Sequence, residues 1–399
     1  MIVGIVGKAN VGKSTFFKAS TLAEVEIANY PFATIKPNHG VGFVKIVCVD
    51  KEFKRQCNPR QGYCRKGFRF VPVDLVDVAG LVPGAHEGKG MGNQFLDDLR
   101  QADALIHVID AAGSTNEKGE PVQPGSYDPA KDVEFLEVEL DMWYLGILKK
   151  GWEKFARTVM QEKQEIHRAL GKQLSGLKVT DDMVTESINE LHLNKDTPTQ
   201  WTGEQLKSLA VSLRKKTKPM IIAANKIDLP SAQKNLPRLR EQFPHHHFIG
   251  CSAESELALK EATKAGLIEY LPGENTFTIL HEAKLNEQQR AALKFIQEHI
   301  LNPFSSTGVQ QVLDTAVLEL LKFIAIFPGG VTKLEDKDGN VLPDCFLLPP
   351  KSTALDFAYK LHTDFGKNFI RALDVKTRKA VGREYLLHHR DVVEIVAGK

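Results

Sequence analysis

The sequence predicts an α/β fold in which a mostly parallel sheet is covered by helices, with a helical insertion and a small C-terminal α+β domain. Short continuous apolar runs, typical of strands buried on both faces, alternate with helical segments along the first part of the chain. Between residues 132 and 218 the sequence becomes long, charged and helical. After Phe327-Pro328-Gly329-Gly330, strand-like segments surround a single predicted helix.

Each element follows from its pattern. The predicted strands of the sheet are the apolar and β-branched segments 2–6, 40–49, 71–78, 104–110, 220–225 and 247–251. The predicted helices outside the insertion are 14–23, 93–101, 286–301, 305–324 and 353–362. The predicted strands of the C-terminal domain are 324–333, 340–348, 369–375 and 392–396.

The insertion shows apolar residues at helical spacing, from Val133 and Leu136 to Leu140 and Trp143, which indicates a helical hairpin or a short coiled coil. Shorter helices are predicted at 181–193 and 203–216. The resulting domain limits are 1–131 and 219–324 for the two parts of the sheet domain, 132–218 for the insertion and 325–399 for the C-terminal domain.

Composition excludes several classes of protein. The 399 residues are 42% hydrophobic, and 52 Lys plus Arg balance 50 Asp plus Glu to a net charge of +2. These values exclude a disordered chain, and a chain so balanced needs a local basic patch to contact nucleic acid. Five scattered cysteines predict a reducing compartment rather than a disulfide framework. With no apolar run long enough for a membrane span, a cytoplasmic location and no membrane partner are expected.

The clearest motif is Gly7-Lys8-Ala9-Asn10-Val11-Gly12-Lys13-Ser14, which matches G-x-x-x-x-G-K-[ST] between a predicted strand and a predicted helix. Glycines let successive backbone N–H groups surround phosphate oxygens, and the helix N-terminus adds positive partial charge. Lys13 is expected to reach the β and γ phosphates, and Ser14 to bind Mg²⁺.

Two further segments predict the rest of the phosphate and metal site. Asp77-Val78-Ala79-Gly80 ends a predicted strand, so Asp77 is expected to hold Mg²⁺ through water and the Gly80 N–H to contact the γ-phosphate. Thr34 lies between the first helix and the second strand, where a switch threonine completes the Mg²⁺ shell. Thr21 competes for this role, but it is predicted to lie on the first helix.

Asn225-Lys226-Ile227-Asp228 closes another buried strand and predicts base recognition. A carboxylate here accepts hydrogen bonds from N1–H and the exocyclic amine of guanine, a pair that adenine lacks. Cys251-Ser252-Ala253 follows the last strand, and its backbone N–H groups are expected at the guanine carbonyl. The predicted nucleotide-binding residues are Gly7, Ala9, Asn10, Val11, Gly12, Lys13, Ser14, Thr15, Asn225, Lys226, Asp228, Ser252 and Ala253. The predicted catalytic residues are Lys13, Thr34 and Gly80, and the predicted Mg²⁺ ligands are Ser14, Thr34 and Asp77.

These motifs stand in the order of a Ras-like P-loop GTPase domain, and their flanks ANVGKST, NYPFATIKPN and STGVQQVL resemble the Obg superfamily. The helical insertion before NKID resembles the YchF branch, especially its archaeal-type members. The segments LHTDFGKNFIRALD and GREYLLHHRDVVEIV resemble a TGS domain, a small β-grasp module. The resemblance covers nearly the whole chain and implies a GTP- and GDP-binding switch.

The comparison with that branch also marks two departures. YchF proteins with N-x-x-E at the base-recognition motif are associated with ATP use, whereas this chain has Asp228, so GTP is expected over ATP. Leu81 follows D-x-x-G where many Ras-like enzymes place a water-orienting glutamine, so slow intrinsic hydrolysis is expected. Asn10 either ligates K⁺ near the phosphates, making K⁺ a second candidate cation, or only shapes the loop. His86 is expected to be an exposed loop histidine.

Two segments are locally basic. Residues 51–70 carry seven basic residues and one acidic residue, a net charge of +6, with aromatic residues interleaved. They either contact RNA or form a solvated positive face. The C-terminal module carries a local charge of +4, and TGS domains resemble RNA- or regulator-binding modules, so ribosome contact is expected there. Cys57 and Cys64 are at best half of a zinc site, so loop packing or a local disulfide is expected.

The leading hypothesis is a GTP-hydrolysing switch whose nucleotide state controls association with ribosomes or other RNA, with a monomer favoured. One alternative is a regulatory binding protein that senses the nucleotide and hardly hydrolyses it. This alternative stays open because Leu81 replaces the water-orienting glutamine. The other is a YchF-like ATPase, which Asp228 opposes.

Overall fold

The computed structural model describes residues 1–22, 38–78 and 99–398. The chain divides into two compact units, one made of residues 1–17 and 75–255 and the other of residues 18–74 and 256–399. The strand Phe68–Asp77 runs from the second unit into the first. Most of the predicted helix 93–101, with Thr34, Gly80, Leu81 and His86, lies outside the described residues.

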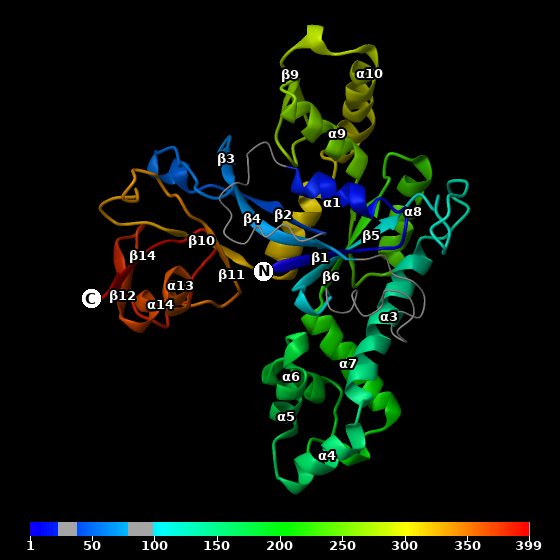
Figure 1. Cartoon of the computed structure of the whole chain (residues 1–399), viewed down its shortest axis with the longest axis vertical. Helices are drawn as coiled ribbons and strands as arrows, with labels where there is room; N and C mark the ends of the chain where they lie inside the picture. The colour runs from blue at the N-terminus through cyan, green and yellow to red at the C-terminus, as the bar shows by residue number, and fades with distance from the viewer. Residues whose placement is uncertain (23–37, 79–98, 399) are drawn as a thin grey trace. The chain divides into compact units, whose positions relative to one another are not determined.

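The main sheet has the strand order β2-β4-β1-β5-β6-β7, and β3 pairs with β4 at its edge (Figure 1). Its strands are β1 (Ile2–Val6), β2 (His39–Val47), β3 (Tyr63–Arg65), β4 (Phe68–Asp77), β5 (Ala104–Asp110), β6 (Met220–Asn225) and β7 (His247–Gly250). The strands β1, β5, β6 and β7 are parallel. Every residue of β5 and β6 is buried, which explains why their sequences are continuous apolar runs.

Helices follow three of the parallel strands; the first was predicted at 14–23, whereas the helices at 230–242 and 253–264 were missed. They are α1 (Lys13–Thr21), α8 (Pro230–Gln242) and α9 (Ala253–Lys264). The carboxyl ends of β1, β5 and β6 therefore lead into loops on one edge of the sheet, where ligands bind in open α/β folds. Thr21 is the last residue of α1, as predicted, and its hydroxyl lies near the Lys18 carbonyl.

The insertion is helical, as predicted, and consists of five α-helices. They are α3 (Ala130–Lys149), α4 (Trp152–Gln161), α5 (Ile166–Gln173), α6 (Asp181–Glu190) and α7 (Gly203–Thr217). The helices α3 and α7 pack side by side, and α4 lies farthest from the sheet (Figure 1). Gly151, in the left-handed region at φ 74°, separates α3 from α4. The buried Arg214 of α7 pairs with Asp141 of α3 at 2.7 Å.

In the sequence, a small α+β segment of the second unit follows α9 and precedes the C-terminal module. It contains β8 (Ile268–Tyr270), β9 (Phe277–Ile279), α10 (Glu287–Ile296), a π-helical turn at Gln297–Leu301, α11 (Asn302–Phe304), α12 (Val309–Asp314) and a second π-helical turn at Thr315–Leu320. The predicted helix 305–324 therefore begins later, because Gly308 at φ 80° precedes its first turn.

The C-terminal module is a five-stranded sheet of order β11-β10-β14-β12-β13 with one main helix. Its elements are β10 (Ile324–Pro328), β11 (Phe346–Leu348), α13 (Ala354–Leu361), α14 (Thr363–Lys367), β12 (Phe369–Asp374), β13 (Lys379–Val381) and β14 (Val392–Ala397). A capping box between Thr353 and Asp356 starts α13, and Phe357 packs into the core of the module. The predicted strands 324–333 and 340–348 are shorter, because Pro328-Gly329-Gly330 and Pro343 interrupt the pattern.

No helix in the described ranges is both long enough and apolar enough to cross a bilayer.

Candidate nucleotide-binding site

The loop between β1 and α1 has the conformation that its glycines allow. A Cβ on Gly7 would lie 2.5 Å from the Val108 carbonyl oxygen of β5, so only glycine fits there. Gly12 has φ +94°, and a Cβ on it would collide with the Asn225 side-chain nitrogen. Asn10 also lies in the left-handed region, at φ 62°. The backbone therefore takes the tight turn that a phosphate-binding loop requires.

At the start of α1, the Lys13 ammonium forms an ion pair with the Asp77 carboxylate at the end of β4. Both side chains are mostly buried, at 12% and 15% exposure. The sequence predicts these residues for phosphate and Mg²⁺, and the structure brings them together although they are far apart in the chain. Ser14, the next residue of α1, lines the same cavity.

Asn225 connects two loops of the site. Its Nδ2 donates to the Val11 carbonyl oxygen at 2.9 Å, and its Oδ1 accepts from the Ala253 N–H at 3.0 Å. The side chain is buried, so both hydrogen bonds are shielded from water. One amide therefore fixes the phosphate loop and the loop after β7 at the same time.

Lys226 is held by an acidic group at the end of β5. Its Nζ lies 3.0 Å from Oδ2 of Asp110, which also accepts hydrogen bonds from the hydroxyls of Ser114 and Thr115. Burial acts to raise the pKa of Asp110, but these hydrogen bonds and the Lys226 charge outweigh it, so the pKa lies below its ordinary value. Asp110 is therefore a permanent anion at neutral pH, and it holds Lys226 in the loop after β6.

Asp228 is positioned by the loop that follows β7. The Ser252 hydroxyl donates to its Oδ1 at 3.1 Å and lies 2.8 Å from the Ser255 hydroxyl. A carboxylate has about four acceptor sites, so this contact leaves acceptor capacity on both oxygens. Asp228 remains partly exposed and lines the cavity.

These loops enclose a cavity of about 520 Å³ within the first unit. The lining residues are Lys8, Ala9, Asn10, Gly12, Lys13, Ser14, Thr15, Ser114, Asn225, Lys226, Asp228, Leu229, Ser252 and Glu254. Three predicted residues, Gly7, Val11 and Ala253, lie in the same loops without lining the cavity. Thr34 and Gly80 lie outside the described residues, so their predicted roles stay predictions.

Sequence reasoning missed four lining residues, namely Lys8, Ser114, Leu229 and Glu254. Lys8 is tied to the insertion, since its Nζ lies 2.8 Å from the Asp132 carboxylate and 3.9 Å from the centre of the Tyr127 ring. The sequence could have predicted Ser114, because it lies in the loop that follows a buried strand ending at Asp110. In parallel sheets such loops at the carboxyl ends of strands bind ligands.

The side-chain amide of Asn10 forms a hydrogen bond within the protein. Its Nδ2 donates to the Gly119 carbonyl oxygen at 2.8 Å, which agrees with a role in shaping the loop. The side-chain oxygen, which is the atom that would bind K⁺, takes no part in that hydrogen bond. K⁺ binding stays a prediction.

The expectation for the cysteines was wrong in one respect. Cys57 and Cys64 were expected to lack partners for a four-ligand site, but the fold brings Cys48 and Asp50 beside them. All five cysteines are free thiols, so the local disulfide that was the alternative is absent from the structure. Spacing alone could not show this, because Cys48 follows β2 and Asp50 begins the next 3₁₀ turn, several residues before Cys57.

Three of the seven basic residues in the segment 51–70 have acidic partners within the second unit, and a fourth is buried. Arg55 pairs with Glu335, Arg60 pairs with Asp344, and Lys66 lies 3.4 Å from Glu269. Arg69 is buried and donates to the carbonyl oxygens of Leu342 and Pro343. The net charge counted from the sequence therefore overstates the positive surface of this segment.

A glycine-constrained loop between β1 and α1, an Asp at the end of the neighbouring strand and an N-K-x-D loop after β6 define a P-loop GTP-binding domain. Family models agree with this class: the model described as a 50S ribosome-binding GTPase matches residues 2–136. The G4-motif domain of the YGR210-like Obg-like GTPases matches residues 223–330, and the TGS domain matches residues 335–397.

The chain belongs to the YchF-related, archaeal-type branch of the Obg-like GTP-binding proteins. It is 50% identical over 397 residues to an uncharacterized GTP-binding protein of Methanocaldococcus jannaschii, covering 99% of both chains. It is 30% identical over 380 residues to the ribosome-binding ATPase YchF of Mycoplasma pneumoniae, covering 92% of this chain and 88% of the relative. The crystal structure of a GTP-binding protein from Pyrococcus horikoshii covers all of both chains, with 40% identity and a TM-score of 0.80. The predicted fold class, a Ras-like domain with a helical insertion and a C-terminal β-grasp TGS domain, is confirmed.

Proposed function

We propose that the protein is a GTP-hydrolysing switch that associates with ribosomes. The observation that carries the proposal is the cavity in which Lys13 and Ser14 of the phosphate loop face the same space as Asp228 of the base loop. A nucleotide would place its phosphates beside the N-terminus of α1 and its base beside Asp228, so that both groups of lining residues have a partner. Nucleotide binding follows from the family, and the choice of GTP follows from Asp228.

The phosphates and Mg²⁺ have suitable partners. Backbone N–H groups of the loop and the Lys13 ammonium suit the β and γ phosphates. The Ser14 hydroxyl and the Asp77 carboxylate are hard oxygen donors, which fit Mg²⁺, and the ion would neutralise negative charge on the phosphates. With nucleotide and Mg²⁺ bound, Lys13 would pair with the phosphates, and Asp77 would help to hold the ion. Thr34 is proposed as the third ligand.

Base selection is proposed to favour guanine. The relatives named ribosome-binding ATPases take adenine nucleotides by name, whereas the Asp228 carboxylate is an acceptor for N1–H and the 2-amino group of guanine. Adenine presents an unprotonated N1 at this edge, so it would leave the carboxylate unpaired and repelled. Direct titration tests this proposal, since comparable affinities for ATP and GTP would contradict it.

Hydrolysis is proposed to be slow. Lys13 stabilises charge on the transferred phosphoryl group, with Thr34 and the Gly80 N–H proposed to assist, but the aliphatic Leu81 cannot orient water. Single-turnover GTP hydrolysis, with and without ribosomes and in K⁺ and Na⁺ buffers, tests the proposal. Ribosome-stimulated turnover supports the switch. Negligible turnover in all conditions favours the nucleotide-sensing binding protein instead, and equal rates in K⁺ and Na⁺ remove the role of K⁺.

The proposed ribosome contact lies on the TGS domain rather than on residues 51–70. Arg371 of β12, Lys379 of the edge strand β13, and Arg378 and Arg383 beside β13 are exposed. In 51–70, by contrast, three of the seven basic residues have acidic partners and Arg69 is buried. Basic groups on an accessible strand edge suit phosphate contacts, which depend on unpaired positive charge.

Charge reversal distinguishes the two surfaces. We expect Arg378→Glu with Lys379→Glu to weaken ribosome co-sedimentation by about ten-fold or more at low salt, because two phosphate contacts are lost and replaced by repulsion. The matched control is Lys51→Glu with Lys54→Glu, an equal change of charge at exposed positions of 51–70. We expect this control to shift binding by less than about three-fold. The reverse order of effects would place the contact on the segment 51–70.

A further inference from the structure

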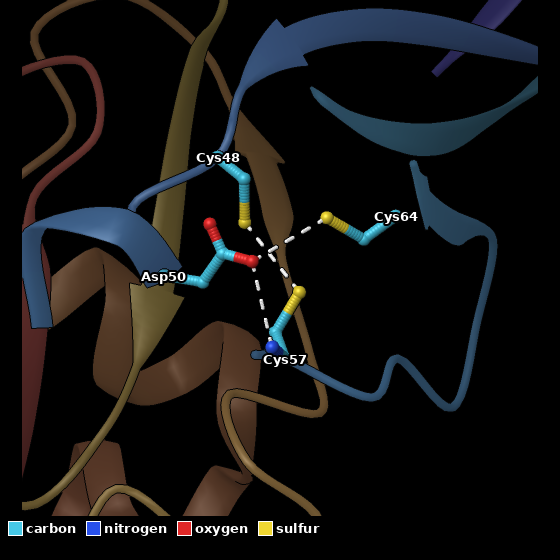
Figure 2. A group of neighbouring side chains, drawn as sticks. All are labelled: Cys48, Asp50, Cys57 and Cys64. Atoms are coloured by element: carbon cyan, nitrogen blue, oxygen red, sulfur yellow. Dashed lines mark hydrogen bonds between the residues drawn. The ribbon is translucent and has the colours of Figure 1, made fainter. Parts of the chain in front are cut away.

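We propose that Cys48, Asp50, Cys57 and Cys64 bind one Zn²⁺ ion as a closed, tetrahedral Cys₃Asp site. Figure 2 shows the four side chains pointing toward a common centre. They come from the end of β2, the 3₁₀ turn Asp50–Phe53, the following loop and β3. The site belongs to the second unit and is separate from the nucleotide cavity.

The distances among the donor atoms match a tetrahedral ion. Two thiolates at a Zn–S length of about 2.3 Å lie about 3.8 Å apart, and a thiolate and a carboxylate oxygen about 3.5 Å apart. In the structure Cys48 Sγ lies 3.5 Å from Cys57 Sγ, and Cys64 Sγ lies 3.7 Å from Asp50 Oδ2. The four donor atoms all lie within 4.8 Å of one another. The site therefore needs little rearrangement to hold an ion at its centre.

Burial of the carboxylate is the second observation. Asp50 is 2% exposed, and its Oδ2 faces the thiol of Cys64 and the backbone N–H of Cys57. Among the described residues, no lysine, arginine or histidine forms an ion pair with it. A buried carboxylate is costly unless a cation or strong donors compensate it. A divalent ion bound by the three sulfurs supplies that compensation.

Arg69 adds positive charge beside the cluster. It lies opposite Cys64 in the β3–β4 pair and is fully buried, and its Nε has no hydrogen-bond partner among the described residues. Zn²⁺ and Arg69 together would offset three of the four negative charges of the ligand set.

Zinc fits the donor set better than the other common ions. Thiolates are soft ligands that Mg²⁺ and Ca²⁺ avoid, and four protein ligands leave no open position, which is typical of structural zinc. The competing chemistry is a disulfide between Cys48 and Cys57, which would need an oxidant and would leave Cys64 and Asp50 without a role.

The ion would stabilise the loop that anchors the start of the TGS region. Next to Cys57, the Asn58 N–H donates to the Val341 carbonyl at 3.1 Å, and the Arg60 N–H donates to the Pro343 carbonyl at 2.9 Å. The Arg60 side chain also pairs with Asp344. Metal binding at Cys57 therefore fixes the segment to which residues 341–344 attach.

The test uses the full-length protein purified under reducing conditions. We expect about one zinc ion per chain by elemental mass spectrometry. After removal of zinc with a chelator, Cd²⁺ should give a thiolate-to-metal charge-transfer band that saturates at about one equivalent, and Co²⁺ should give the intense visible bands of a tetrahedral site. Chelation should lower the unfolding temperature of the protein by about 5 °C or more.

Two variants complete the test. Cys64→Ser changes a partly exposed ligand, and it should reduce bound zinc to below about one fifth of the wild-type content while GDP affinity is kept. The matched control, Cys345→Ser, removes a thiol outside the cluster and should bind zinc as the wild type does. The proposal is overturned if wild-type protein with free thiols gives no charge-transfer band with Cd²⁺, or if the isolated protein contains a Cys48–Cys57 disulfide and no metal.

Discussion

Asp228→Asn is expected to weaken GTP binding by about 10²- to 10⁴-fold and to create affinity for xanthosine triphosphate. In the proposed base site the Asp228 carboxylate would accept two hydrogen bonds from guanine, and charge-assisted hydrogen bonds contribute about 1.5–3 kcal/mol each. Xanthine has a carbonyl group in place of the 2-amino group, so the amide of asparagine can donate where the aspartate accepts. Titration calorimetry with GTP, ATP and xanthosine triphosphate measures the change.

This substitution has an internal control. The side chain keeps its size, and its oxygen can still accept from the Ser252 hydroxyl, 3.1 Å from Asp228 Oδ1. Phosphate contacts are therefore preserved, and affinity for xanthosine triphosphate shows that the variant is folded. Loss of GTP binding with no gain for xanthosine triphosphate would mean that Asp228 does not contact the base. Unchanged GTP affinity would exclude it from base recognition altogether.

Lys13→Ala is expected to weaken binding of both GTP and GDP by about 10²-fold or more. In the proposed site the ammonium would supply charge-assisted hydrogen bonds to the β and γ phosphates, and its loss also leaves the mostly buried Asp77 without its cation. Guanosine monophosphate lacks both phosphates, so its weak affinity should change by less than about three-fold. Competition against a fluorescent GDP analogue gives all three affinities.

The matched control for this prediction is Lys18→Ala. Lys18 is exposed on the same helix, so the variant removes an equal charge without touching the cavity. GTP and GDP affinities like those of the wild type are expected. Equal losses in both variants would show a general effect of charge on α1, and an unaffected Lys13→Ala variant would contradict the phosphate site as described.

The strands that sequence reasoning located best are the most deeply buried ones. The predicted segments 104–110 and 220–225 coincide with β5 and β6, because parallel strands covered on both faces must be apolar at every position. The short strands β8, β9 and β13 were missed. Each of these strands has only three residues, which is too short a segment to show an alternating pattern, although each pairs with a strand nearby in the sequence.

In the candidate site, too, the parts that depend on local sequence could be predicted and the long-range contacts could not. The phosphate loop is local, since Gly7 to Ser14 carry both its conformation and its donors, and sequence is enough to find it. The contacts that place Asn225 against Val11 and Asp110 against Lys226 join distant segments. The thiol cluster is the clearest failure, because nothing in the spacing marks Asp50, among 50 acidic residues, as the neighbour of three cysteines.

The position of Asn225 has a consequence for how the site opens. Its two hydrogen bonds, to the Val11 carbonyl and from the Ala253 N–H, tie the loop after β1 and the loop after β7 to one side chain. When a local fluctuation breaks one of these hydrogen bonds, the Asn225 side chain becomes free to move and the other hydrogen bond is weakened. The two loops should therefore open together as one cooperative unit. In native-state hydrogen exchange, the amide protons of both loops should therefore show the same opening free energy, and guanine release should relax the phosphate loop as well as the base loop.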